Sequence, residues 1–347
     1  MTYTLDFPTG KVTYYMNSPA AGLRKLCPPE NTILITDEHV RAAWPMLFDD
    51  YRTITIPAGE HNKTLDTVGD IIAQLVTAGA DRKYTIVGIG GGVVTDITGL
   101  AASVFMRGVK FGFVPASLLA MVDAAIGGKN GVNVGMWKNM AGVIQQPAFI
   151  WYDTALLQTL PEAEWSNGFA EVIKYGAICD PMLLDELSTH DLKHYQQDEK
   201  ALENLIARCA SLKNEIVLAD EQEGGLRKIL NFGHTAGHAL ERIYDLPHGQ
   251  AVAAGMAIAC NISEKKTGMP PAVTRQITDT LKRYGLNQLT DIDTDRVMDL
   301  LKADKKKNGT TIDYILLSAK GEAKIVPMPP DEIAQALRNY ESTFSTR

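Results

Sequence analysis

The sequence has few cysteines, no excess of basic residues and no long apolar run. Its four cysteines lie far apart and form no Cys-x-x-Cys pair, which argues against a thiolate metal site or a disulfide framework. Lys and Arg total 34 against 41 Asp and Glu, and the formal net charge is -7. A nucleic acid is therefore not expected as a partner, because counterion release needs a basic face.

The sequence contains no candidate membrane span and no secretion signal. No stretch reaches the length of a membrane span, and the segment 1–11 has no basic flank followed by an apolar run. There is no internal repeat and no low-complexity tract. We expect a folded protein of the reducing cytoplasm that does not bind membranes.

What is present is the composition of an ordinary globular protein, with 45% hydrophobic residues in a chain of 347. This length is large for one hydrophobic core, so two domains are expected. The first half alternates β-rich runs with helical patterns, which predicts an α/β fold with a doubly wound parallel sheet, as in Rossmann-like domains. The expected strands are 32–35, 53–56, 84–88, 111–114 and 149–152, and the expected helix between them is 64–77.

Helical periodicity dominates after about residue 160, so the second domain is expected to be mostly α-helical. A long helix is predicted over 199–219, followed by an acidic loop over 220–225, and a hairpin over 311–327. We place the domain boundary between residues 157 and 158.

A glycine turn follows the strand expected at 84–88. The residues Gly90-Gly91-Gly92 end a buried strand and precede a helical pattern, with Asp96 expected in the first turn of the helix. Such a turn directs free backbone N–H groups towards an anion such as a pyrophosphate. Val93 stands where the GxGxxG fingerprint needs its last glycine, so a tight connection without a ligand is an equal interpretation of this segment alone.

Histidines and one acidic residue form the most informative pattern. His234 and His238 are four residues apart and share one face of a predicted helix, and His248 opens a second helix with small residues. Glu171 lies in an apolar helix with Lys174 one turn later. Two histidines and a carboxylate suit catalytic Zn²⁺. Core histidines packed against glycine-rich helices are the alternative.

Cations in glycine-bordered segments indicate recognition of an anionic small molecule, because the protein as a whole is acidic. We expect Arg107, Lys129 and Lys138 to lie in loops. Solvated surface charge is the alternative for each of them, and it is the preferred interpretation of the run Lys305-Lys306-Lys307.

These motifs, taken together and in this order, resemble the 3-dehydroquinate synthase family, one of the sugar-phosphate cyclases. The resemblance extends from about residue 37 to residue 306. It rests on the following segments: Gly90-Gly91-Gly92, Arg107-Gly108, Asp123, Gly127-Gly128-Lys129, Lys138-Asn139, 170–174, 231–238 and His248-Gly249.

The resemblance implies an NAD-binding α/β domain over 1–157 and an α-helical metal- and substrate-binding domain over 158–347. It also implies a homodimer, NAD, and a divalent metal, Zn²⁺ or Co²⁺. The implied metal ligands are Glu171, His234 and His248. The implied NAD contacts are Asp37, Glu60, Lys63, Gly91, Gly92, Asp96, Ser117, Lys129, Lys138 and Thr159.

The family's substrate is a phosphorylated sugar acid, 3-deoxy-arabino-heptulosonate 7-phosphate, which becomes 3-dehydroquinate and phosphate in the shikimate pathway. The resemblance assigns Lys129 and Arg227 to its carboxylate, and Arg107, reaching across the dimer, with Asn231 and Lys305 or Lys306 to its phosphate. His238 is expected near the phosphate without binding metal. The residues implied at the substrate hydroxyls are Asp123, Asn139, Lys174 and Lys213.

The resemblance further implies that NAD takes a hydride from a ring hydroxyl and later returns it, so that the cofactor is recycled. Some residues depart from the family's usual pattern, and hydroxyl contacts to the nucleotide are expected to differ here. These residues are Thr95, Ala116-Ser117, Ala124-Ala125 and Asn130-Gly131.

Three other functions remain open on sequence grounds. The first is a cyclase acting on sedoheptulose 7-phosphate or glucose 6-phosphate. The second is a metal-dependent polyol dehydrogenase, which would release NADH. The third is a nucleotide-binding module without catalytic activity.

Overall fold

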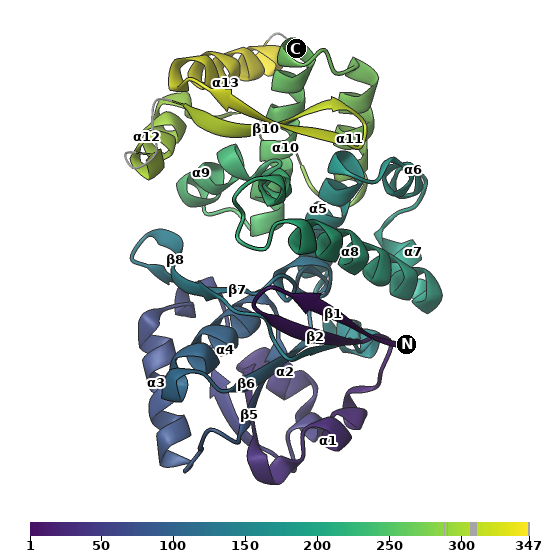
Figure 1. Cartoon of the computed structure of the whole chain (residues 1–347). Coiled ribbons are helices and arrows are strands. Elements are labelled where there is room, and N and C mark those ends of the chain that lie inside the picture. Colours follow the sequence, from purple (N-terminus) through teal and green to yellow (C-terminus); the bar gives the residue numbers. More distant parts are fainter. Residues whose placement is uncertain (288, 290, 306–310, 346–347) are drawn as a thin grey trace. The chain divides into compact units, whose positions relative to one another are not determined.

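In the computed structural model, the apolar runs of the first half of the chain form the parallel strands of one sheet (Figure 1). The structure describes residues 1–287, 289, 291–305 and 311–345. The chain divides into two compact units. Unit 1 comprises Met1–Trp165 and Asp198–Gln222, and unit 2 comprises Ser166–Gln197 and Glu223–Arg347.

Unit 1 contains a seven-stranded sheet in the order β1-β2-β9-β6-β5-β3-β4. Only β1 and β2 pair antiparallel; the other neighbours are parallel. All six residues of β5 are buried, as expected of an interior parallel strand. The strands are β1 (Thr2–Phe7), β2 (Gly10–Tyr15), β3 (Thr32–Asp37), β4 (Arg52–Ile56), β5 (Thr85–Gly90), β6 (Lys110–Pro115) and β9 (Phe149–Trp151).

The helices of unit 1 begin where the sequence supplies a cap. Thr64 accepts a hydrogen bond from Thr67 N at the start of α3, and Asp198 accepts one from Ala201 N at the start of α8. The helices are α1 (Leu23–Leu26), α2 (Glu38–Ala43), α3 (Leu65–Thr77), α4 (Gly92–Val104) and α8 (Glu199–Ala219). The shorter turns are η1 (Ala20–Gly22), η2 (Pro29–Asn31), η3 (Pro45–Leu47), η4 (Glu60–Asn62), η5 (Phe105–Arg107), η6 (Ala120–Ala124) and η7 (Thr154–Thr159).

A separate hairpin, β7 (Lys129–Val134) with β8 (Trp137–Ile144), packs against α4 (Figure 1). The prediction that Lys129 and Lys138 lie in loops is therefore wrong, because both are strand residues. Glycine is required here for close approach of the two strands. A Cβ atom on Gly142 would lie 2.4 Å from the carbonyl oxygen of Asn130.

Unit 2 is mostly helical among its described residues, with one small hairpin. Its helices are α5 (Glu162–Ile178, from Ser166 on), α6 (Pro181–Thr189), α7 (Leu192–Gln197), η8 (Leu226–Asn231), α9 (His234–Tyr244), α10 (His248–Lys266), α11 (Pro271–Arg283), α12 (Thr294–Lys305) and α13 (Pro330–Ser345). Its strands are β10 (Ile312–Ala319) and β11 (Glu322–Met328). The predicted α/β fold with a mostly helical C-terminal part is confirmed. The division at residues 157 and 158 into two binding domains stays a prediction.

Helices α9 and α10 approach each other through glycine. A Cβ atom on Gly255 would lie 1.9 Å from the carbonyl oxygen of Gly233, and one on Gly237 would lie 2.9 Å from that of Ala251. No side chain fits between the two helices at these points. This contact fixes the relative positions of the histidines that begin the two helices.

Replacing Gly255 with alanine is expected to lower the free energy of unfolding by about 2–3 kcal/mol, because the helices must separate. Gly69→Ala in α3 is the matched control, since no atom lies within 4 Å of its added Cβ. That control should be stabilised by about 0.5–1 kcal/mol, as expected for glycine to alanine in a helix. Urea denaturation measures both, and a Gly255→Ala variant as stable as the unchanged protein would contradict this account of the packing.

Candidate active site

Three potential ligand atoms from three helices of unit 2 come together. Glu171 lies in α5, His234 is the first residue of α9, and His248 is the first residue of α10. The Nε2 atom of His248 is 3.0 Å from Oε1 of Glu171, and the Nε2 atom of His234 is 3.4 Å from the same oxygen. One ligand atom from each residue lies within 4.8 Å of the others.

Glu171 is a fully buried carboxylate, with 0% of its side chain exposed. Its Oε2 atom contacts the ammonium of Lys174, which is also buried. Burial favours the neutral acid, but the charges of Lys174 and His234 and the hydrogen bonds from both histidines outweigh it and hold the pKa of Glu171 well below its ordinary value. Glu171 is therefore an anion at neutral pH.

The two histidines present the same ring nitrogen to Glu171. The Nδ1 atom of His234 is 3.1 Å from the carbonyl oxygen of Phe232, to which a protonated Nδ1 donates. A neutral ring protonated at Nδ1 would offer the lone pair of Nε2 to a metal. Burial lowers the pKa of His248, but hydrogen bonds and charges from Glu171 and Glu241 outweigh burial and raise it to about 9.

The start of α10 is held by a side chain from another helix. Pro247 supplies no side-chain cap, and the N–H of Gly249 donates to Oδ1 of Asn167 in α5 at 2.7 Å. A Cβ atom on Gly249 would lie 2.7 Å from Cα of Asn167. This contact holds the helix that carries His248 against the helix that carries Glu171.

Two imidazoles and one carboxylate fit a divalent transition metal such as Zn²⁺ or Co²⁺. Catalytic zinc sites use three protein ligands of this kind and keep a further position for water or substrate. The ring of His238 lies edge-on to that of His234, with centroids 5.2 Å apart, and its side chain is exposed. The prediction that His234 and His238 share one helix face is confirmed.

Metal binding to this cluster is expected to release about one proton at pH 7.5, because His248 has a pKa of about 9 in the metal-free protein. This pKa exceeds the unfolded value of about 6.5, so the group stabilises the metal-free fold below about pH 6.5 and loses that effect as pH rises through about 9. Titration calorimetry in buffers of different ionisation enthalpy counts the protons. Release that does not decline between pH 7.5 and pH 10 would contradict the shift.

The glycine turn of unit 1 lies at a switch point of the sheet. Strand β3 pairs with β4 on one side and β5 on the other, so the chain reverses direction across the sheet between β3 and β5. Ligands bind α/β sheets at the carboxyl ends of such strands. Asp37 ends β3, and Gly91 precedes α4 without any side-chain cap. The N–H groups of α4 therefore suit an anion, as the sequence predicts.

Four of the residues predicted to contact NAD, together with Asn139, lie in one network of unit 1. The Lys63 ammonium is 2.5 Å from Oδ2 of Asp96 and donates to Oδ1 of Asn139 at 2.7 Å. The Lys138 ammonium is 3.8 Å from Oε1 of Glu60. The placement of Asp96 in the first helical turn is wrong, because α4 begins at Gly92 and Asp96 is its fifth residue.

Other residues predicted to contact NAD already take part in local contacts. Oδ1 of Asp37 caps α2 by accepting from His39 N and Val40 N. Ser117 Oγ accepts from Ala120 N, and a Cβ atom on Gly91 would lie 3.4 Å from that oxygen. Thr159 Oγ1 accepts from the indole N–H of Trp44. The roles predicted for these residues stay predictions.

The residues predicted to contact substrate fall into local pairs within each unit. In unit 1, the Lys213 ammonium is 2.9 Å from Oδ1 of Asp123. In unit 2, Asn231 donates to Oε1 of Glu223 at 3.1 Å, and Arg227 is buried in η8. The side chain of Lys305, and Lys306 and Lys307 entirely, lie outside the described residues.

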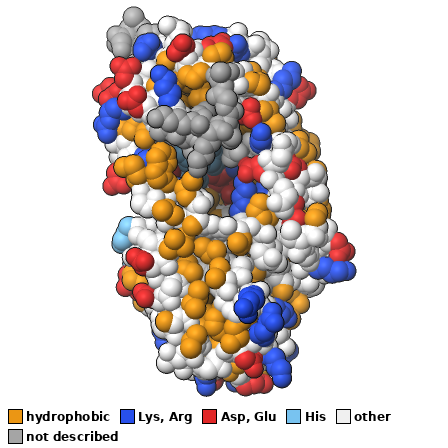
Figure 2. All heavy atoms as spheres, turned by 60° about the vertical axis from the view of Figure 1, so that its left-hand side comes forward, with side chains coloured by type: hydrophobic (Ala, Val, Ile, Leu, Met, Phe, Trp, Pro, Cys, Tyr) orange, Lys and Arg blue, Asp and Glu red, His pale blue; other side chains and the backbone are white. Residues whose placement is uncertain are grey.

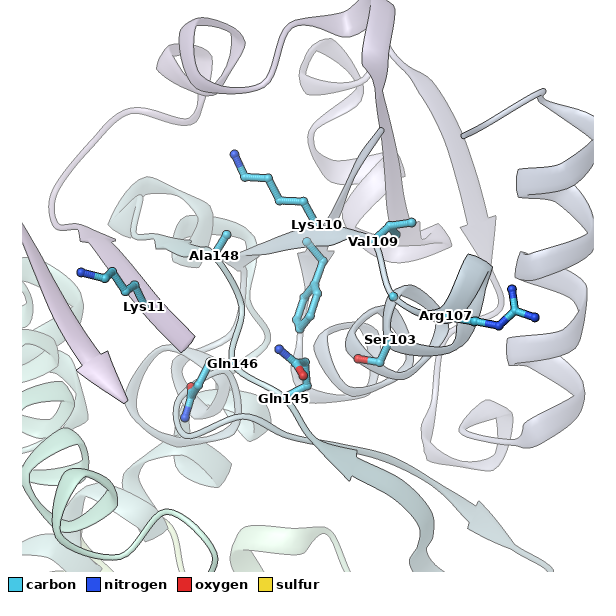
Figure 3. Close-up of a pocket in the computed structure, with 10 residues that line it drawn as sticks. Lys11, Ser103, Arg107, Val109, Lys110, Gln145, Gln146 and Ala148 are labelled. Carbon is cyan, nitrogen blue, oxygen red and sulfur yellow. The ribbon is translucent and has the colours of Figure 1, made fainter. Parts of the chain in front are cut away.

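Arg107 is exposed in a left-handed turn, not in an ordinary loop. Met106, Arg107 and Gly108 have φ angles of 48°, 66° and 109°, a conformation that costs energy in the residues other than glycine. Arg107 borders an open pocket of unit 1 of about 400 Å³, together with Lys11 and Lys110. Figure 3 shows its side chain extending away from these two lysines.

Sequence reasoning missed three polar residues of unit 2. Glu241 and Asn167 contact the start of α10, and Glu223 accepts from Asn231. Glu241 is buried in α9, and its Oε1 atom is 3.8 Å from Nδ1 of His248. The spacing of seven residues from His234 and three from His238 on one helix could have identified it. Asn167 and Glu223 carry no such periodic signal, since they act across helices or from a strained turn.

A glycine turn at a sheet switch point and a His₂Glu cluster in a helical unit define a class of protein suited to a dinucleotide and a catalytic metal. Two family models match the chain: the 3-dehydroquinate synthase N-terminal model over residues 53–167 and the C-terminal model over 168–307. The chain is 35% identical over 344 residues to 3-dehydroquinate synthase from Leptospira interrogans, covering 95% of each chain. The chain belongs to the 3-dehydroquinate synthase family.

Solved structures of two related synthases share the fold. One is 2-deoxy-scyllo-inosose synthase with carbaglucose-6-phosphate, NAD⁺ and Co²⁺, which is 25% identical with a TM-score of 0.85 and covers 98% of this chain and 99% of its own. Another is 2-epi-5-epi-valiolone synthase from Streptomyces hygroscopicus with NAD⁺ and Zn²⁺, which is 26% identical with a TM-score of 0.86 and covers 96% of each chain.

Proposed function

We propose that this chain converts 3-deoxy-arabino-heptulosonate 7-phosphate to 3-dehydroquinate and phosphate, as a lyase of the shikimate pathway in aromatic amino acid biosynthesis. The observation that carries the proposal is the meeting of Glu171, His234 and His248, in a chain that belongs to this family. Catalytic NAD and a divalent metal, Zn²⁺ or Co²⁺, are its cofactors. Support comes from the related structures that hold NAD⁺ with Co²⁺ or Zn²⁺.

The metal, when held by Glu171, His234 and His248, supplies Lewis acidity to a substrate hydroxyl. NAD supplies a hydride acceptor that is restored within each turnover. The chain's own residues bind, orient and transfer protons. We assign the proton transfer near the phosphate to His238, whose exposed ring lies beside that of His234.

Buried cations support the choice of an anionic substrate. Arg227 has 1% of its surface exposed, and a guanidinium binds a carboxylate through paired hydrogen bonds. We assign Arg227 and Lys129 to the substrate carboxylate. Lys213 is held by both the carbonyl oxygen and the carboxylate of Asp123, which fixes its ammonium for a substrate hydroxyl.

The remaining roles follow the same assignment. We propose that Arg107, Asn231 and Lys305 or Lys306 bind the phosphate, and that Asp123, Asn139 and Lys174 contact the hydroxyls. The proposed NAD contacts are Asp37, Glu60, Lys63, Gly91, Gly92, Asp96, Ser117, Lys129, Lys138 and Thr159. The network of Glu60, Lys63, Asp96 and Lys138 supports the grouping of four of these residues.

Phosphate release tests the function. The purified protein with NAD and Zn²⁺ is expected to release phosphate from 3-deoxy-arabino-heptulosonate 7-phosphate, and EDTA is expected to abolish the release until metal is restored. NADH should not accumulate, which distinguishes a cyclase from a polyol dehydrogenase. Turnover of sedoheptulose 7-phosphate or glucose 6-phosphate instead would favour another sugar-phosphate cyclase, which is the second candidate; the likeness to the two related synthases supports it as the alternative.

The proposed location is the cytoplasm. All four cysteines are free thiols, as is usual in a reducing compartment. Among the described residues, no helix combines the length and the apolar character needed to cross a membrane.

We also propose that the chain forms a homodimer, because unit 1 exposes apolar side chains on elements that pack against one another. Figure 2 shows hydrophobic side chains gathered on one face of this unit. Exposed apolar patches of this kind mark interaction sites. The large exposed apolar residues of α3, α4, η5 and the β7–β8 hairpin are Leu65, Val76, Val104, Met106, Val134, Met136 and Met140.

Light scattering after gel filtration is expected to give a mass near twice 37.9 kDa. A Met136→Lys and Met140→Lys double variant should shift the protein towards the monomer, because charge replaces apolar surface at the hairpin. Met46→Lys is the control, since Met46 is exposed in η3, outside these elements. A monomeric mass for the unchanged protein would disprove the dimer. A double variant that stays dimeric would show that the interface does not include Met136 and Met140.

A further inference from the structure

His248 lies between two buried carboxylates. Its Nε2 atom is 3.0 Å from Oε1 of Glu171, and its Nδ1 atom is 3.8 Å from Oε1 of Glu241. The Glu241 side chain is 7% exposed and Glu171 is fully buried. Glu171 belongs to the proposed metal site, whereas Glu241 has no assigned role. A carboxylate beside the second ring nitrogen of a ligand histidine is placed where it can act on that ring.

His234 shows what the second nitrogen of such a histidine needs. The Nδ1 atom of His234 faces the carbonyl oxygen of Phe232 at 3.1 Å, while its Nε2 atom faces Glu171. A neutral imidazole carries one N–H and one lone pair, so an acceptor at Nδ1 directs the lone pair to Nε2. The ring is then oriented and in the tautomer that binds metal through Nε2.

At His248, the carboxylate of Glu241 faces Nδ1, as the carbonyl oxygen of Phe232 does at His234. Glu241 is the eighth residue of α9, and the close contact of α9 with α10 through Gly237 and Ala251 brings it towards the first residue of α10. Carboxylates that accept the outer N–H of a ligand histidine raise the basicity of the ring and fix its orientation. Glu241 can supply both effects.

We propose that Glu241 is a positioning residue of the metal site: its carboxylate, 3.8 Å from Nδ1 of His248, attracts the Nδ1–H and holds Nε2 towards Glu171. The inference rests on the metal site proposed above and deepens it. His234 obtains the same support from a backbone carbonyl oxygen. The site is therefore held from outside by one neutral and one charged acceptor.

A competing arrangement uses the same atoms. Potential ligand atoms of His238, Glu241 and His248 also lie within 4.8 Å of one another. In that arrangement Glu241 would bind a second cation and His248 would use both ring nitrogens as ligands. The number of metal ions bound per chain separates the two arrangements, since the positioning role requires one ion.

The experiment compares Glu241→Gln and Glu241→Ala with the unchanged protein. Zn²⁺ affinity is measured by chelator competition, bound metal by elemental analysis, and the ligand field by the visible absorption spectrum of the Co²⁺ form. We expect one ion per chain, and an affinity weakened by about 10–100-fold in Glu241→Ala. Glu241→Gln should lose less affinity, because the dipole of its amide oxygen still faces Nδ1. The Co²⁺ spectrum should shift in both variants.

Glu264→Gln is the matched control. Glu264 is half-buried in α10, sixteen residues from His248 and roughly 24 Å along the helix axis. The Zn²⁺ affinity and the Co²⁺ spectrum of the Glu264→Gln variant should equal those of the unchanged protein. Circular dichroism verifies folding, and Glu241→Gln, which keeps the shape of the side chain, carries the test if the alanine variant does not fold.

The outcomes separate this inference from the proposed function. Unchanged Zn²⁺ affinity and an unchanged Co²⁺ spectrum in both variants would overturn the positioning role even if phosphate release is normal. Two ions in the unchanged protein and one in Glu241→Ala would replace it with the second-cation arrangement. Weakened metal binding in a protein that releases no phosphate from any of the three substrates would support the positioning role and reject the proposed function.

Discussion

Glu171→Gln is expected to abolish stable metal binding and to lower phosphate release by roughly 10²–10³-fold or more, a loss like that of other charge-stabilising groups in enzymes. Glutamine keeps the shape of the side chain but removes the charge that His234 and His248 face. Two neutral imidazoles and an amide oxygen are a poor ligand set for Zn²⁺. Elemental analysis and the phosphate assay measure both effects.

Glu171 also has a structural partner, so the variant needs a control. Its carboxylate contacts the Lys174 ammonium, whose side chain is 2% exposed. Removing one member of a buried ion pair leaves the other charge uncompensated, which costs about 3–5 kcal/mol. Part of the effect of Glu171→Gln is therefore expected as lost stability, measured by urea denaturation.

The double variant Glu171→Gln with Lys174→Met separates the two effects. Removing both charges should restore most of the stability, because no buried charge remains uncompensated. It should not restore metal binding, because the ligand is still absent. A double variant that binds Zn²⁺ with the affinity of the unchanged protein would show that Glu171 serves only the ion pair, and the proposed metal site would be wrong.

Strands and helices were predicted correctly from the sequence where their apolar residues follow the periodicity of a strand or of a helix. Buried strands such as β5 are continuous apolar runs, and α8 was predicted with the bounds Glu199–Ala219 that the structure has. His234 and His238 were placed on one face by their spacing. That Glu171 lies beside His234 was expected from its place in an apolar helix one turn before Lys174, and from the resemblance. Periodicity carries no information across a separation of 63 residues.

Elements whose glycines serve close packing were missed. The segment that forms β7 and β8 contains Gly131, Gly135 and Gly142, which resembles a loop in sequence. In the structure Gly131 and Gly142 face each other across the hairpin, where a side chain would collide with the opposite backbone. The N-terminal hairpin of β1 and β2 was not predicted either, although Tyr3, Leu5 and Phe7 alternate as a strand requires.

Lys63→Met is the second variant with a large expected effect, because it leaves Asp96 in a buried position without its nearest cation. The Lys63 side chain is 7% exposed, that of Asp96 is 17% exposed, and the two are 2.5 Å apart. The variant should lose about 3–5 kcal/mol of unfolding free energy. NAD affinity should fall as well, since both residues belong to the proposed nucleotide site. Urea denaturation and calorimetric titration with NAD measure the two quantities.

The pKa of Asp96 determines how the stability of the Lys63→Met variant changes with pH. Burial raises the pKa of Asp96 even though Lys63 lowers it, so the folded carboxyl binds its proton more tightly than the unfolded one, whose pKa is about 3.9. Stability therefore increases as pH falls through the folded pKa. Removing Lys63 raises that pKa further. The Lys63→Met variant should recover stability between neutral pH and pH 5 more strongly than the unchanged protein does.

Two further variants distinguish an ion-pair effect from general disruption. Lys63→Met with Asp96→Asn should regain most of the stability while NAD binding stays weak, because the charge is gone but the nucleotide contacts are not restored. Lys138→Met should change stability by less than about 0.5 kcal/mol, since its contact with Glu60 is 3.8 Å long and partly exposed. If Lys63→Met is as stable as Lys138→Met at neutral pH, Asp96 is not held by Lys63. The position of Asp96 in α4 must then be maintained by the packing of α4 against β5, β6, β7 and α3.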